Sequence, residues 1–147
     1  MRAMPTDPKI ETCPQCGAPT VEGLDCWGQL CAILSWEWQN PELLAVHFLT
    51  VASYNLQHPM QFAEKAIEGL RASFTAHLQG RISVAEIRRA TNARYAGKAR
   101  VLRDPALCRP VLRHWSMTVA DVYLSGKPEG ATHRVKQWAA TIANEIA

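Results

Sequence analysis

Apolar residues recur every three or four positions along most of the chain after residue 25. This spacing places them on one face of an α-helix, which makes a turn every ~3.6 residues. The face is clearest near the C-terminus, where five apolar residues share one side of a predicted helix: Val135, Trp138, Ala139, Ile142 and Ile146. No stretch alternates between apolar and polar residues for long enough to predict a strand. The pattern predicts an all-α fold, a compact bundle of about five to six helices.

Capping residues and prolines set the ends of these helices. Asn40 is a preferred N-cap, and Pro41 suits the first turn because its missing N–H has no helical partner there. Ser83 and Glu86 have the spacing of a capping box, and Pro59 disfavours helical geometry at the residue before it. The predicted helices cover residues 26–39, 41–57, 59–78, 83–100, 118–126 and 128 onward.

Length and composition fit one folded domain. The chain has 147 residues, 48% of them hydrophobic and 20% charged, which is ordinary for a globular protein. We therefore expect a single domain over residues 1–147, with a tail and zinc knuckle in residues 1–25 and the helical bundle in residues 26–147. No apolar stretch is long enough to cross a membrane, and the first residues lack the apolar core of a signal peptide. We expect a cytoplasmic protein without a membrane partner.

A pair of cysteines near the N-terminus carries the clearest chemistry. Cys13 and Cys16 are three positions apart, with two residues between them, and precede Gly17, as in the tight turn of a metal-binding knuckle. Thiolates are soft ligands, so the pair favours zinc over hard cations. The alternatives are a redox pair of the thioredoxin type and two reduced thiols without a ligand. The redox motif follows a strand, and none is predicted before Cys13. We therefore expect zinc as the cofactor.

Two more ligands would complete a closed tetrahedral site. Cys26 begins the first predicted helix, and the short turn at Asn40 predicts a second helix antiparallel to the first. His58, at the end of that second helix, then lies beside Cys26. His47 comes 11 residues earlier, which puts it about 16 Å away along the helix. The predicted metal ligands are Cys13, Cys16, Cys26 and His58, with Cys31 as the alternative to His58.

The same residues match a known family. The opening from Cys13 to Gly17, the later Cys26, and the stretch from His47 to Pro59 resemble a bacterial family described as domain of unknown function 5946. Its members share a Cys-Pro-x-Cys-Gly opening, a later cysteine, and a His-x-Leu-x-Val-x-x-Tyr-x-x-Gln-His-Pro stretch. The resemblance covers most of the chain and implies no activity. It points to the cysteines and histidine already predicted as ligands.

Two other histidines, His47 and His77, fall within apolar helical faces. Two buried histidines can form a second metal site or an acid–base pair. Counted from the turn at Pro59, however, His47 lies roughly 10 Å along the helix axis from His77. We therefore expect core histidines whose hydrogen bonds are satisfied.

Positive charge is concentrated in one segment. The chain has a net charge of +3, whereas residues 81–113 carry nine basic and two acidic residues, a formal charge of +7. Clustered cations bind the phosphates of nucleic acids. Around a helix, however, these basic residues scatter over most of the circumference, and Tyr95 is the only aromatic residue among them. A solvated helix face is the favoured interpretation.

These patterns support three functional hypotheses. The first is a zinc-stabilised helical binding or adaptor domain whose partner is unknown. The second is a metal-dependent enzyme with an open zinc position for water, and the third is nucleic-acid binding through residues 81–113. The number of protein ligands separates the first two, because a fourth ligand closes the metal site. The sequence identifies no catalytic residue and no oligomeric state.

Overall fold

The computed structural model describes residues 11–94 and 101–147. Within these residues the chain forms α-helices and short 3-10 helices but no strand, which confirms the all-α prediction. The α-helices are α1 Cys26–Trp36, α2 Pro41–Ala45, α3 His47–Leu56, α4 Glu64–Leu78, α5 Val84–Arg94, α6 Val119–Tyr123 and α7 Ala131–Ile146. The 3-10 helices are η1 Glu37–Gln39, η2 Pro59–Gln61 and η3 Pro105–Leu107.

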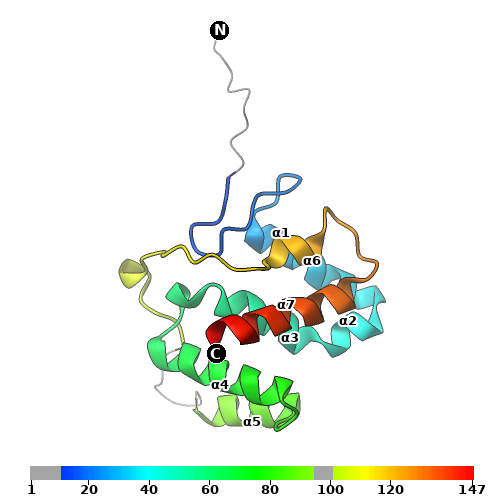
Figure 1. Ribbon diagram of the computed structural model, residues 1–147. Helices are drawn as coiled ribbons and strands as arrows, with labels where there is room; N and C mark the ends of the chain where they lie inside the picture. The colour runs from blue at the N-terminus through cyan, green and yellow to red at the C-terminus, as the bar shows by residue number, and fades with distance from the viewer. Residues whose placement is uncertain (1–10, 95–100) are drawn as a thin grey trace.

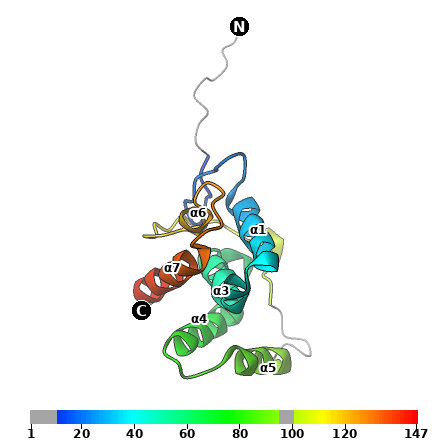
Figure 2. The same cartoon turned by 90° about the vertical axis from the view of Figure 1, so that its right-hand side faces the viewer.

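Helices α3 and α7 pack against each other at the centre of the molecule (Figure 1). α6 packs on both α1 and α7, and α4 packs on both α3 and α7. α5 lies beyond α4, at the end of the molecule opposite α1 (Figure 2). The segment before α1, drawn in blue in Figure 1, therefore lies far from α5.

The core forms where these helices meet. Trp138, Phe74 and Ile33 are among its largest fully buried side chains, and burying each such side chain stabilises the fold by about 1.5–3 kcal/mol. The predicted face of the last helix is confirmed: four of its five apolar residues are buried and Ile146 packs partly buried against the core. Amphipathic periodicity thus predicted this part of the core correctly.

A buried polar residue, Gln57, crosslinks the centre of the fold just before His58. Its side-chain amide donates a hydrogen bond to the carbonyl of Met117 over 2.8 Å. The indole N–H of Trp138 donates to its Oε1 over 3.2 Å. Because a buried amide is costly without partners, these bonds fix the end of α3 against α7 and the segment before α6.

The structure divides the predicted second helix in two. Val46, with φ −107° and ψ 20°, leaves helical geometry, so α2 ends at Ala45 and α3 begins at His47. The next predicted helix also starts later, at Glu64. Phe62 is extended there and forms a bridge with Leu102, a contact between distant segments that local pattern does not reveal.

The fourth predicted helix begins as expected. The backbone N–H of Glu86 donates to the Ser83 hydroxyl, and the Glu86 carboxylate accepts from the Ser83 backbone N–H, which completes the capping box. The predicted tail in residues 1–10 and the predicted end of this helix, residues 95–100, lie outside the described residues.

Candidate metal centre

A tight turn carries the first two predicted ligands. The N–H of Gly17 donates to the carbonyl of Cys13, and the N–H of Cys13 donates to the carbonyl of Ala18, both over 2.9 Å. Gly17 has φ +78°, a left-handed conformation that favours glycine. The backbone N–H groups of Gln15 and Ala18 donate to Sγ of Cys13 and Cys16, each over 3.4 Å. Such donors stabilise thiolates.

Polar contacts hold this turn against the start of α1, where Cys26 lies. The side-chain amide of the fully buried Gln29 donates to the carbonyls of Pro19 and Leu24 over 2.8 and 3.0 Å. The Asp25 carboxylate caps α1 by accepting a hydrogen bond from the backbone of its first turn. Cys26 therefore enters the helix at a fixed position beside the knuckle.

The fourth predicted ligand, His58, follows the end of α3. Its side chain is 2% exposed, and its ring stacks on that of Tyr54 with the centroids 4.0 Å apart. Nδ1 lies 2.6 Å from the carbonyl oxygen of Tyr54. The other ring nitrogen, Nε2, lies 3.5 Å from Sγ of Cys13 and 3.4 Å from Sγ of Cys26.

The structure thus brings the whole predicted set together. The ligand atoms of Cys13, Cys16, Cys26 and His58 all lie within 4.8 Å of one another, and these residues could hold a metal ion. All but Cys13 are buried. Cys31, the alternative fourth ligand, is exposed and lies outside this group. The predicted approach of His58 to Cys26 is therefore confirmed.

A comparison with protein families found one match that covers almost the whole chain. The model of a family of unknown function, DUF5946, matches residues 11–147. The chain belongs to this family. No curated protein and no solved structure matched the chain. Within the described residues of this DUF5946 member, no helix is long and apolar enough to cross a membrane.

Hydrogen bonds and burial inside the cluster shift the pKa values of Cys16, Cys26 and Tyr54 in different directions. The hydrogen bond with Cys16 lowers the pKa of Cys26 to about 4, and contacts with His58 and Tyr54 act in the same direction. The pKa of Cys16 is raised by its hydrogen bond to Cys26 and by burial. Burial and the bond to the Cys26 sulfur raise the pKa of Tyr54. The Cys26 thiol is therefore more acidic than an ordinary cysteine, which favours the thiolate form that binds metals.

Tyr54 supports the cluster in a way that the sequence did not reveal. Its hydroxyl lies 3.4 Å from Sγ of Cys26, while its carbonyl oxygen contacts His58. The ring of Trp27 packs against that of Tyr54 in an edge-type arrangement, with the centroids 6.0 Å apart. One signal for this role was present in the sequence: Tyr54 stands four residues before His58. This is about one helical turn, the spacing at which the backbone carbonyl of Tyr54 can reach the side chain of His58.

The two remaining histidines lie outside the cluster. His77 is partly buried, and its Nδ1 donates to the carbonyl of Ile82 over 3.0 Å, so it has the satisfied hydrogen bond that was expected. His47 also has the expected hydrogen bond, to the Glu37 carboxylate, but the expected core position is wrong because its side chain is 44% exposed. The break at Val46 accounts for this, because it makes His47 the first residue of α3.

Proposed function

We propose that this chain is a helical binding or adaptor domain stabilised by one zinc ion, which Cys13, Cys16, Cys26 and His58 hold. The spacing of the ligand atoms carries the proposal. With Zn–S at about 2.3 Å and Zn–N at about 2.0 Å, tetrahedral geometry puts sulfur and nitrogen about 3.5 Å apart. The corresponding distances from Nε2 of His58 are 3.5 and 3.4 Å. An ion at the centre of the cluster thus fits the positions of these donors.

The donor set favours zinc and a structural role. Three thiolates and one imidazole form a soft ligand set of the kind that binds zinc in structural sites. Four protein ligands fill a tetrahedral shell, so no position remains for a reacting water. This argues against the enzyme hypothesis, which needs one of the four residues to stay unbound.

The proposed ion would join three segments at one end of the bundle: the knuckle, the start of α1 and the end of α3. Structural zinc contributes folding free energy because an unfolded chain holds no preformed site. A binding role would use large apolar side chains that are left on the surface and are accessible to a partner. Trp38 is 90% exposed and Trp27 is 59% exposed.

Metal analysis and thermal unfolding test the proposal. Protein purified without chelator should contain about one zinc per chain, bound by three sulfurs and one nitrogen in X-ray absorption spectra. Removing the metal should lower the melting temperature by roughly 10 °C or more, because each kcal/mol lost is ~2–4 °C in a domain of this size.

The opposite results would reject the proposal. Metal-free protein whose melting temperature is unchanged by a chelator would rule out zinc stabilisation. A spectrum with three protein ligands and one oxygen would instead favour the enzyme hypothesis, because that oxygen would mark a bound water.

A further inference from the structure

A cavity of about 590 Å³ lies between α3, α4 and α5. Its volume is within the range of about 300–1,000 Å³ that is typical of small-molecule sites. None of the four candidate metal ligands lines it. Most of its lining is apolar, and the largest apolar side chains are Phe48, Phe62, Ile67, Leu70 and Ile87.

Within residues 11–94 and 101–147, the charged residues that line this cavity all have the same sign. They are Arg88 and Arg94 on α5, and His47 joins them from α3 when its ring is protonated. No aspartate or glutamate is among the lining residues that the structure describes. The cavity thus combines apolar walls with cationic groups, which is complementary to a molecule with an apolar body and a negative charge.

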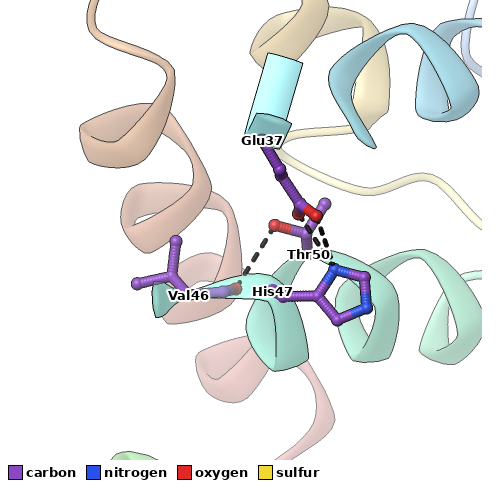
Figure 3. A network of polar contacts seen from close by, with 4 residues as sticks. All are labelled: Glu37, Val46, His47 and Thr50. Atoms are coloured by element: carbon purple, nitrogen blue, oxygen red, sulfur yellow. Dashed lines mark hydrogen bonds and ion pairs between the residues drawn. The ribbon is translucent and has the colours of Figure 1, made fainter. Parts of the chain in front are cut away.

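A buried carboxylate orients the histidine at one end of the cavity. Glu37 is 7% exposed, and its two carboxylate oxygens lie 2.8 and 3.0 Å from Nδ1 of His47 (Figure 3). A buried carboxylate is costly unless it is paired, so this contact keeps the imidazole in place. Nε2 of His47 makes no hydrogen bond to any residue in the described part of the chain.

The backbone around the break in the predicted helix places this histidine. Val46 leaves helical geometry, and the hydroxyl of Thr50 donates to its carbonyl over 3.3 Å (Figure 3). His47 therefore starts α3 next to Glu37, while Asn55 lines the cavity eight residues further along the same helix. At ~1.5 Å per residue, this lining spans about 12 Å.

We propose that the cavity binds an anionic amphiphile: a small molecule with an elongated apolar body and one carboxylate. The apolar body lies along α3 between α4 and α5, and the carboxylate pairs with Arg88 and His47. Glu37 and the bound carboxylate then flank the imidazolium, which donates one hydrogen bond to each. This proposal does not depend on the metal centre, because the two sites share no residue.

Calorimetric titration of the full chain with octanoate tests the proposal. Octylammonium, which has the same apolar body and the opposite charge, is the matched control ligand. We expect saturable binding of octanoate and at least about tenfold weaker binding of octylammonium, because a charge-assisted hydrogen bond is lost and like charges meet. No saturable binding of octanoate, or equal affinity for the two ligands, would overturn the proposal.

Two neighbouring arginines provide a matched pair of variants. Both arginines are exposed, but only Arg88 is among the residues that line the cavity. Arg88→Gln should weaken octanoate binding about tenfold, and Arg89→Gln should leave it unchanged. Equal effects of the two substitutions would show non-specific attraction to the basic segment and would overturn the proposed site.

A cavity-filling variant tests the position of the apolar body. Ala66 lines the cavity from α4, and Ala66→Phe should abolish octanoate binding while the far-UV circular dichroism remains that of the original chain. Undiminished binding to this folded variant would overturn the proposal. If Ala66→Phe does not fold, the comparison of Arg88→Gln with Arg89→Gln still tests whether octanoate binds in the cavity.

Discussion

Nδ1 of His58 lies 2.6 Å from the carbonyl oxygen of Tyr54, one helical turn earlier. A carbonyl oxygen can only accept, so the proton of the neutral ring is on Nδ1. The lone pair is then on Nε2, the atom that faces the sulfurs of Cys13 and Cys26. Backbone geometry therefore sets the tautomer that a metal needs, which is the usual role of a hydrogen bond behind a histidine ligand.

The first prediction compares two histidines of the same segment. His58→Ala should raise the dissociation constant for zinc by at least about 100-fold, more than the loss of an outer contact would. His47→Ala should leave it unchanged, because His47 pairs with Glu37 outside the cluster. Competition with a chromogenic chelator measures both values. An equal effect of the two substitutions would reject His58 as the fourth ligand.

The second prediction compares two cysteines of α1. Cobalt(II) bound in place of zinc gives intense charge-transfer absorption for each thiolate ligand, so its spectrum reports the sulfur count. Cys26→Ser should lower this absorption, and Cys31→Ser should not, because Cys31 is exposed and outside the cluster. Loss of absorption in Cys31→Ser protein would mean that Cys31 replaces one of the proposed ligands.

The third prediction isolates the hydroxyl of Tyr54. Tyr54→Phe keeps the ring and the backbone carbonyl that contacts His58 but removes the contact with Sγ of Cys26. We expect zinc affinity to fall about tenfold, as is typical when an outer hydrogen bond is lost. Tyr123→Phe is the control, since that hydroxyl donates instead to Glu22. Similar affinities of the two variants would show that the hydroxyl does not support the metal centre.

The candidate metal centre could be predicted because two local rules fix it. Cys13 and Cys16 are brought together by a short turn, which their spacing alone reveals. Cys26 and His58 are 32 residues apart, yet their approach follows from helix length and from the turn at Asn40. Both inferences use the regular geometry of helices, which does not depend on the packing of particular side chains.

The cavity could not be predicted because it depends on contacts between distant residues. A charged residue such as Glu37 is rarely buried, and nothing in its local pattern pairs it with His47. The break at Val46 interrupts a stretch whose apolar spacing fits a continuous helix. Tertiary contacts overrode that local pattern, and they placed a partly exposed histidine where a core residue was expected.

The last prediction concerns nucleic acids. The basic segment 81–113 has the charge for phosphate binding, but several of its cations have partners within the molecule. Arg103 donates to the carbonyl of Phe62, while Arg113 donates to the carbonyl of Glu145 and its guanidinium lies 4.0 Å from the centre of the Trp115 ring. These contacts leave fewer cations to face a duplex.

We therefore expect negligible binding to generic DNA or RNA at physiological salt. Fluorescence anisotropy with labelled duplexes should show retention only at low salt, with affinity falling steeply as salt releases counterions. Dissociation constants of about 1 μM or tighter near 150 mM salt would contradict this expectation if Arg88→Glu with Arg89→Glu abolished the binding. In that case, α5 would be a nucleic-acid-binding helix, and the proposed metal centre would support it from the opposite end of the bundle.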